Sequence, residues 1–371
     1  DLRTGVTADL DGNYVLNNLP ERNFLVQVKL IGYTTLSAQV NTATVKQKNF
    51  AMSAATVETG EVVVTGSAFT SLNNRSSVPV APIDRKELQS TGAGNIVAAL
   101  GQVPGVSGIS TGSSIDKPVI RGLGYNRIVT INEGLRQEGQ QWGDEHGLEI
   151  DQFSADRIEI LKGPSSLLYG SDALGGVINI LEPLPAPEGC THGAYDAQVA
   201  SNNGLVSSSL MLEGNHKGSI WRVRGTLRDA GSFITPAERV YNSAFKEQDL
   251  NVLLGLNRKW GYSHLHFSMY DSKPGLVEGE RDSASGKLTD AEGNIAVDNG
   301  AWDHSIALPF QRINHLKVSS VNSLFIGNGN LRVTAGFQQN RRREYEDSST
   351  EPGLYFSLNT SSIDAKYYLP E

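Results

Sequence analysis

The sequence predicts a mainly β protein whose three zones differ in their residue pattern. Residues 1–57 carry short apolar runs at spacing two, residues 71–185 mix helix-like with strand-like segments, and residues 190–371 alternate apolar and polar residues over long stretches. Side chains at spacing two lie on one face of a β-strand. We therefore expect a small β-sandwich, then an α+β domain, then about eight strands of an antiparallel sheet.

The composition argues against two classes of protein. The chain has 371 residues with 32 Lys and Arg against 40 Asp and Glu, which gives a net charge of −8. This acidic balance argues against a nucleic-acid partner, because phosphate binding needs a clustered positive field. No run of about eighteen apolar residues occurs, which argues against a membrane-spanning helix and leaves transmembrane β-strands open. The single cysteine, Cys190, cannot form an intrachain disulfide.

Residues 1–57 combine turn residues with short alternating runs. The cluster from Asp9 to Asn13 predicts a turn, and Leu19-Pro20 separates the two runs that follow it. The apolar residues at spacing two are Tyr14, Leu16, Phe24, Val26, Val28 and Leu30. They predict short antiparallel strands of a small β-sandwich.

The middle zone alternates short helices with short strands. Asp84–Ser90 and Asn95–Leu100 have helical composition, and Gly101 and Pro104 end the second of them. The strand-like runs are Arg127–Asn132, Arg157–Leu161 and Gly176–Ile180. Glycines separate these pieces, which is typical of a compact mixed domain.

The third zone has two-faced strands. In the run from Trp221 to Arg228, Trp221, Val223 and Leu227 fall on one face, whereas the arginines and Thr226 fall on the other.

Short connections near 215–218, 259–261 and 327–330 alternate with long ones near 230–247, 271–311 and 342–353. In a meander this alternation gathers the long loops at one end, as in outer-membrane barrels. A soluble β-sandwich would show the same alternation of residues and remains the alternative. A barrel piece of about eight strands would leave an edge that lipid cannot satisfy, so we expect the barrel to be incomplete in this chain.

Several motifs in the middle zone resemble those of the TonB-dependent outer-membrane receptors. The motifs are Pro104-Gly105-Val106, Ile120-Arg121-Gly122, the run from Arg157 to Pro164, Leu168-Tyr169-Gly170, and the run from Gly175 to Ile180. Their order and spacing also match that family. The resemblance implies that residues 71–185 are a plug domain and that residues 190–371 are the first part of a transmembrane β-barrel.

The amino-terminal zone is similar to the carboxypeptidase-regulatory-like domain. That family has the pattern found here in Asp9 to Tyr14, Leu19-Pro20 and Ile31-Gly32-Tyr33. That family normally has one or two strands before this point, so we expect residues 1–57 to be a truncated copy. Residues 58–70 then form the segment that leads into the plug.

The resemblance also assigns plug scaffold residues: Arg121, Gly122, Arg157, Glu159, Gly163, Gly170, Gly175, Gly176 and Asn179. The glycines suit close backbone approach and positive φ in a compact domain. We expect the two arginines and Glu159 to form buried or half-buried ion pairs with the polar barrel wall, as scaffold and not as ligand contacts.

The segment before the plug resembles the family's TonB box, which consists here of Glu61, Val62, Val63, Val64 and Thr65. The resemblance implies that it pairs as an added strand with a TonB-type energy-transducing protein on the periplasmic side. β-Branched residues favour such an extended edge. The alternative is an ordinary strand that closes the first domain.

A loop within the plug zone carries metal-ligand residue types: Asp144, Glu145 and His146. Carboxylate and imidazole groups are compatible with zinc. The loop looks like that of the zinc-uptake branch of the family, although that branch tends to have Asp where Glu145 stands. Asp303, His304 and His315 are the candidates for completing the site. The alternative is a solvated turn, because two ligands from one loop make a weak site.

The resemblance implies active import across the outer membrane of a Gram-negative bacterium. The expected cargo is a metal ion or metal chelate (zinc, haem or a siderophore), and the protein would contact outer-membrane lipid. We expect no catalytic residues and no required cofactor, with zinc or a chelate bound only as cargo. One alternative is a glycan importer of the same fold, although the run from Tyr169 to Gly176 resembles siderophore, haem and metal receptors. The other alternative is a secreted β-sandwich adhesion module.

Overall fold

The computed structural model describes residues 6, 8–9, 12–17, 19–28, 36–51, 63–64, 71–72, 80–139, 143, 146–163, 166, 169–290, 293–327 and 329–369. The chain forms two compact units, Asp1–Thr59 and Gly60–Glu371. Each unit is described by itself below.

The first unit contains one antiparallel strand pair among its described residues. β1 (Asn23–Val28) pairs with β2 (Leu36–Asn41) along their whole length. The alternating run from Phe24 to Val28 thus forms the predicted strand. The strand predicted at Tyr14 and Leu16 is wrong, because residues 12–17 adopt no strand. The Tyr14 hydroxyl donates a hydrogen bond to the carbonyl of Lys48 at 2.5 Å, so a side-chain contact holds this segment where a ladder was expected.

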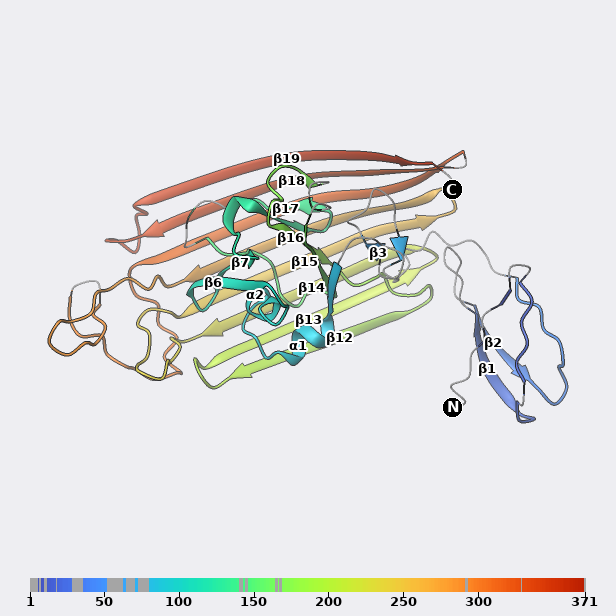
Figure 1. Cartoon of the computed structure of the whole chain (residues 1–371), viewed down its shortest axis with the longest axis horizontal. Helices are drawn as coiled ribbons and strands as arrows, with labels where there is room; N and C mark the ends of the chain where they lie inside the picture. Colours follow the sequence, from blue (N-terminus) through green and yellow to red (C-terminus); the bar gives the residue numbers. More distant parts are fainter. Residues whose placement is uncertain are drawn as a thin grey trace. The chain divides into compact units, whose positions relative to one another are not determined.

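The predicted plug is built on a five-stranded sheet (Figure 1). In spatial order its strands are β5 (Val80–Asp84), β10 (Arg157–Leu161), β11 (Gly176–Leu181), β8 (Ile128–Asn132) and β9 (Leu135–Arg136). β11 and β8 run parallel, and the other neighbours run antiparallel. Ile158, Ile160 and Ile178 are fully buried in the core of this domain.

Two short helices and a hairpin complete the plug. α1 (Arg85–Ser90) begins where the Asp84 carboxylate accepts the Glu87 N–H at 2.8 Å. α2 (Ile96–Leu100) begins where the Asn95 side chain accepts the Ala98 N–H at 2.9 Å. The remaining elements are the hairpin of β6 (Val106–Gly112) with β7 (Ile115–Ile120), and the 3-10 turn η2 (Tyr125–Arg127). Both predicted helices are therefore confirmed, and their caps explain where each starts.

Two of the predicted TonB-box residues lie in a short strand. β3 (Val63–Val64) pairs antiparallel with β4 (Ser71–Leu72). The other box residues, Glu61, Val62 and Thr65, lie outside the described residues.

Residues 191–368 form one antiparallel sheet in which each strand pairs with the next along the chain (Figure 1). The strands are β12 (Thr191–Ala200), β13 (Leu205–His216), β14 (Ser219–Ala230), β15 (Phe245–Arg258), β16 (Gly261–Pro274), β17 (Phe310–Ile326), β18 (Gly329–Tyr345) and β19 (Leu354–Tyr368). This confirms the predicted meander of eight strands.

The connections of the large sheet alternate in length as the sequence predicts. Two residues join β13 to β14, β15 to β16 and β17 to β18, whereas the longest connection, between β16 and β17, runs from 275 to 309. The first connection, 201–204 between β12 and β13, is short and breaks the alternation. The long loops gather at one end of the sheet, opposite the short turns (Figure 1). Within the described part of the chain, no helix is both long and apolar enough to cross a membrane.

Candidate functional site

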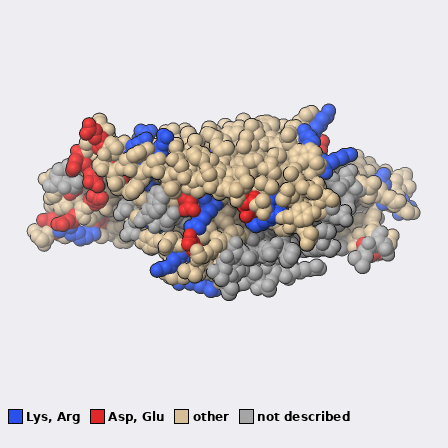
Figure 2. All heavy atoms as spheres, turned by 90° about the horizontal axis from the view of Figure 1, so that it is seen from above, with Lys and Arg blue, Asp and Glu red and all other residues tan. Residues whose placement is uncertain are grey.

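The strands of the large sheet bury their charged face and expose their apolar face. On β14, Arg222, Arg224 and Arg228 are at most 5% exposed, whereas Trp221 and Leu227 are 38% and 60% exposed. A soluble sandwich would bury the apolar face. An outer-membrane barrel has an apolar outside and a polar inside. This inversion decides between the two folds that the sequence left open. In Figure 2 a broad middle band carries few charges, and acidic side chains gather at one end.

The buried face of the large sheet contacts carboxylates of the plug, and Glu149 has the densest set of partners. One carboxylate oxygen accepts a hydrogen bond from Arg342 on β18 at 2.7 Å. The other lies 2.7 Å from His315 Nδ1 on β17 and also accepts from Asn340. Glu149 is buried, and that burial opposes ionisation, but the contacts with His315 and Arg342 outweigh it and lower the pKa of the Glu149 carboxyl.

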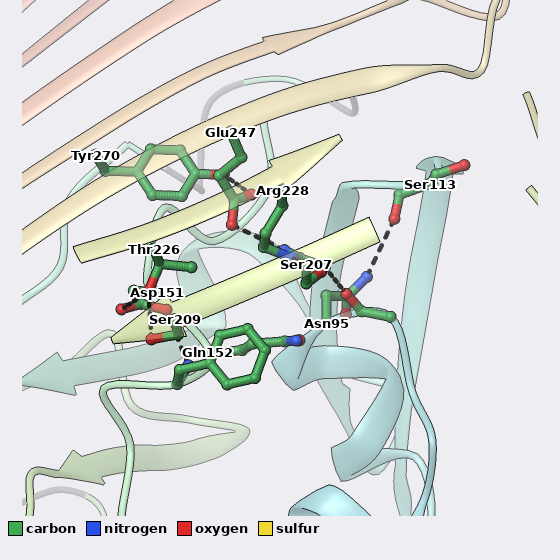
Figure 3. A network of polar contacts seen from close by, with 12 residues as sticks. Asn95, Ser113, Asp151, Gln152, Ser207, Ser209, Thr226, Arg228, Glu247 and Tyr270 are labelled. Carbon is green, nitrogen blue, oxygen red and sulfur yellow. Dashed lines mark hydrogen bonds and ion pairs between the residues drawn. The ribbon is translucent and has the colours of Figure 1, made fainter. Parts of the chain in front are cut away.

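Asp151 makes a second junction with β14 and β15. Its carboxylate accepts hydrogen bonds from Thr226 at 3.0 Å and from Asn251 at 3.1 Å. The Thr226 hydroxyl also lies 2.8 Å from the Ser209 hydroxyl on β13, from which it can accept a second hydrogen bond. Figure 3 shows Asp151, Thr226 and Ser209 side by side between the plug and the sheet.

A third junction joins α2 of the plug to the same strands (Figure 3). Arg228 pairs with Glu247 on β15 at 2.8 Å and also donates to the carbonyl of Gly94, just before α2. Tyr270 on β16 donates to Glu247 at 3.0 Å. The cavity beside these groups measures about 20 Å³, which is room for one water molecule.

Further ion pairs join the plug to four strands of the sheet. They are Arg85 to Asp196 on β12 (2.6 Å), Glu182 to Arg222 on β14 (3.1 Å), Glu182 to His266 on β16 (3.1 Å) and Glu133 to Lys317 on β17 (2.9 Å). The plug is thus held to strands along most of the sheet by short charged and polar contacts, in which Arg222 and Lys317 are almost completely buried.

The Asp151 junction predicts a pH dependence of stability. Burial, with a smaller contribution from the nearby Glu247, raises the pKa of the Asp151 carboxyl from 3.8 to about 6. The folded protein therefore binds this proton more tightly than the unfolded chain, so its stabilising effect is complete below pH 3.8 and is lost as the pH rises through 6. Asp151→Asn, which stays neutral, should match the wild type near pH 4 and be more stable by about 3 kcal/mol near pH 8.

Thermal unfolding of both proteins between these two pH values measures the difference. Asp347→Asn, at an exposed acid in a loop, is the matched control and should show no such trend. A difference between wild type and Asp151→Asn that does not change with pH would contradict the prediction.

The structure corrects the expected partners of two plug arginines. Arg157 pairs with Glu159 at 3.0 Å, two residues along β10, and no described carboxylate of the large sheet forms an ion pair with it. Arg121 is exposed, and none of the described carboxylates forms an ion pair with it. The reason for the first correction is local, since residues i and i+2 of a strand share a face. Arg121 instead has φ 51° and donates its backbone N–H to Gly105 at 2.8 Å.

The other scaffold residues lie in turns and in the core. Gly176 has φ +149°, and a Cβ there would lie 2.6 Å from the carbonyl oxygen of Leu161. Gly175 lies against Arg127 and Leu123, and Asn179 is buried on β11. Gly122, Gly163 and Gly170 have positive φ but open space where a Cβ would point.

The predicted metal ligands have separate partners in the structure. His304 Nδ1 lies 2.9 Å from Asp229, and Asp303 accepts the Ser305 N–H at 3.0 Å. His315 contacts Glu149, as described above. This corrects the expectation that the three loop and strand residues converge with the plug loop on one ion. Across the described residues, no three His, Cys, Asp or Glu side chains are arranged to hold a metal.

Of the three candidate ligands in the plug loop, His146 lies among the described residues. His146 is buried, with Nδ1 3.4 Å from the carbonyl oxygen of Gly139 and Nε2 3.9 Å from Glu344 on β18. Asp144 and Glu145 lie outside the described residues.

A larger cavity lies among the long loops. It measures about 380 Å³ and is formed by residues of the β14–β15 loop and the β16–β17 loop. Its lining includes Glu238, Arg239, Lys287, Asp298 and Asp303. This size falls within the range of small-molecule sites, and the mixed charges suit a polar ligand.

The sequence motifs did not identify Glu149, Asp151, Glu133 or Glu182. Glu149 and Asp151 are two residues apart, and Glu133 and Glu182 lie far from them in the sequence, so the four form no recognisable motif. The signal that could have found these acids is in the large sheet. The arginines, histidines and lysine that contact the acids all lie on the polar face of a strand. A charged face that is buried needs charges opposite it.

Comparisons with known proteins agree with this architecture. The TonB-dependent Receptor Plug Domain family matches residues 73–177, and the CarboxypepD_reg-like domain family matches residues 1–64. The chain is 35% identical over 179 residues to an iron-regulated outer membrane virulence protein of Vibrio cholerae, which covers 46% of this chain and 26% of that protein. The chain therefore spans about a quarter of the length of that curated relative.

Two solved structures share the fold. The ferric citrate transporter FecA in its unliganded form matches with a TM-score of 0.62 and 16% identity, over 79% of this chain and 44% of that one. The ferric yersiniabactin uptake receptor FyuA from Yersinia pestis matches with a TM-score of 0.57 and 18% identity, over 79% and 46%. The chain therefore carries a plug domain of the TonB-dependent receptors at residues 73–177, and its structure shares the fold of two solved uptake receptors.

Proposed function

We propose that this chain is part of an active importer in the outer membrane of a Gram-negative bacterium. The observation that carries the proposal is the inverted large sheet, which turns apolar side chains outward and charged ones toward a plug. Such a surface suits lipid outside and a gated polar lumen inside. The strands have 10 to 17 residues, and crossing the hydrocarbon core takes about 9–11.

The proposed cargo is a metal chelate. The relatives' names concern iron regulation, ferric citrate and ferric yersiniabactin, which favours a ferric chelate over free zinc. The loop cavity, with Arg239 and Lys287 beside Glu238 and Asp298, offers charges of both signs to such a ligand. The plug loop with Asp144, Glu145 and His146 is a second proposed contact, on the plug side.

The proposed partner is a TonB-type protein that pulls on residues 61–65. The support is that Val63 and Val64 already form an extended strand, whose pairing with Ser71 and Leu72 has the geometry of strand addition. A partner strand would take the place of β4, and the pull would reach the plug through β5.

A transport assay tests the proposal in the full-length receptor, expressed in cells that lack other importers. Val64→Pro removes a backbone donor and should abolish energised uptake of a labelled ferric chelate while leaving surface binding unchanged. Val64→Ile, which keeps both the donor and the extended preference, is the matched control. Unchanged uptake by Val64→Pro would refute coupling through this segment.

The same assay separates the cargo alternatives. His146→Ala should weaken chelate uptake if the plug loop contacts cargo, whereas His216→Ala, at an exposed histidine next to a short turn, should not. Uptake of labelled zinc in place of the chelate would favour the free metal ion. Uptake of an oligosaccharide alone would favour the glycan importer.

A further inference from the structure

The outward face of the large sheet carries a group of five cations on four neighbouring strands, which we call the cationic patch. It consists of Lys246 on β15, Lys273 on β16, Arg312 on β17, and Arg341 and Arg343 on β18. The patch lies near the end of the sheet with the long loops, because its residues lie at or near the strand ends that join those loops.

The strand register brings like charges directly opposite one another in this patch. Lys246 is paired with Lys273, and Arg312 is paired with Arg343. Lys273 also lies close enough to Lys246 and Arg312 for their charges to interact. Like charges in facing positions of a sheet destabilise it. Two such pairs side by side therefore have an energetic cost that an anion between them would remove.

The protein's own acids compensate only part of this charge. Asp229 lies 3.5 Å from Lys246, and Asp271 lies 3.8 Å from Arg312. Five cations against these two carboxylates leave three positive charges, in a chain whose net charge is −8. Arg341 is exposed, and no carboxylate of the described residues forms an ion pair with it or with Arg343.

The patch directly adjoins the apolar surface of the same strands. Arg341 shares its face of β18 with Phe337, which is 40% exposed, and Lys273 shares its face of β16 with Met269, which is 39% exposed. On the other side of the patch lies the acidic loop end. Figure 2 shows a group of basic side chains between the acidic end and the uncharged middle band. If the band is in hydrocarbon, the patch is at the depth of lipid headgroups.

We propose that the cationic patch binds the phosphate groups of an anionic lipid headgroup in the leaflet that faces the long loops. This inference rests on the membrane placement proposed above. A phosphate between Lys273 and Arg312 would screen both like-charge pairs at once, since arginine binds phosphate with two parallel bonds and lysine binds it as a point charge.

The test uses the full-length receptor in neutral phosphatidylcholine nanodiscs, titrated with a diphosphorylated glycolipid delivered in mixed micelles. The double variant Lys273→Gln with Arg312→Gln should bind about 25-fold more weakly than wild type, at roughly fivefold for each charge removed. The matched control, Lys217→Gln with Lys259→Gln, removes two lysines in the short turns at the opposite end and should bind like wild type.

Two further arms identify the ligand. The dephosphorylated glycolipid should bind equally weakly to all three proteins, and inorganic phosphate at the same concentration should not compete. Equal binding of the phosphorylated lipid by the double variant and the wild type would overturn the inference. Failure of the wild type itself to enter nanodiscs would instead count against the proposed membrane placement.

Discussion

Replacing Glu149 by alanine is expected to lower the free energy of unfolding of the plug by about 3–5 kcal/mol. The substitution removes the carboxylate that lies 2.7 Å from Arg342, whose guanidinium is almost completely buried. It also removes the group 2.7 Å from His315. Removing one member of a buried charged network is costly because the remaining charge cannot return to water. Urea unfolding of the full-length receptor, followed by limited proteolysis of the plug, measures the change.

Two variants separate the charge from the rest of the side chain. Glu149→Gln keeps an acceptor oxygen, so its free energy of unfolding should fall less than that of the alanine variant. Glu188→Ala, at an exposed glutamate after the plug, should not change the midpoint. If Glu149→Ala and Glu188→Ala unfold at the same urea concentration, the network around Glu149 does not anchor the plug.

Gly176→Ala is expected to lower the free energy of unfolding by about 2–6 kcal/mol. A φ of +149° is a region that side chains other than glycine adopt at a cost of about 1–3 kcal/mol. The new methyl group would also lie 2.6 Å from the carbonyl oxygen of Leu161 and 3.0 Å from Ile120. Such overpacking adds about 1–3 kcal/mol. The same urea titration measures this change.

Gly122→Ala is the matched control for Gly176→Ala. Gly122 also has a positive φ, +78°, but no atom lies within 4 Å of where its Cβ would be. Gly122→Ala should therefore lower the free energy of unfolding only through backbone strain, by about 1 kcal/mol. Equal losses in the two variants would show that close packing against Leu161 contributes nothing.

The local structure of the plug could be predicted because short-range rules determine it. Asp84 and Asn95 cap the two helices, and the strands at 157 and 176 follow the β-branched runs. The pairing of Arg157 with Glu159 could also have been predicted, because a spacing of two places them on one face. The expectation of a partner on the barrel wall overlooked this nearer partner on the same strand.

Alternation alone could not predict which face of the large sheet is buried. The run from Trp221 to Arg228 defines two faces, and an aqueous sandwich and a membrane barrel bury opposite ones. Only the three-dimensional arrangement, with plug carboxylates against Arg222 and Thr226, identifies the buried face. The network around Glu149 depends on strand register between segments far apart in sequence, which no local pattern encodes.

Among the described strands, β5 occupies the edge of the plug sheet and pairs with β10 alone, in a register that runs from Val80 opposite Leu161 to Asp84 opposite Arg157. A mechanical load that enters from the amino-terminal side of Val80 therefore meets a strand that can detach alone. The other four strands keep their pairing when it leaves, and Glu149 and Asp151, which follow β9 in the chain, stay bound to the large sheet. Unravelling that starts at this edge would therefore release β5 before the rest of the plug sheet.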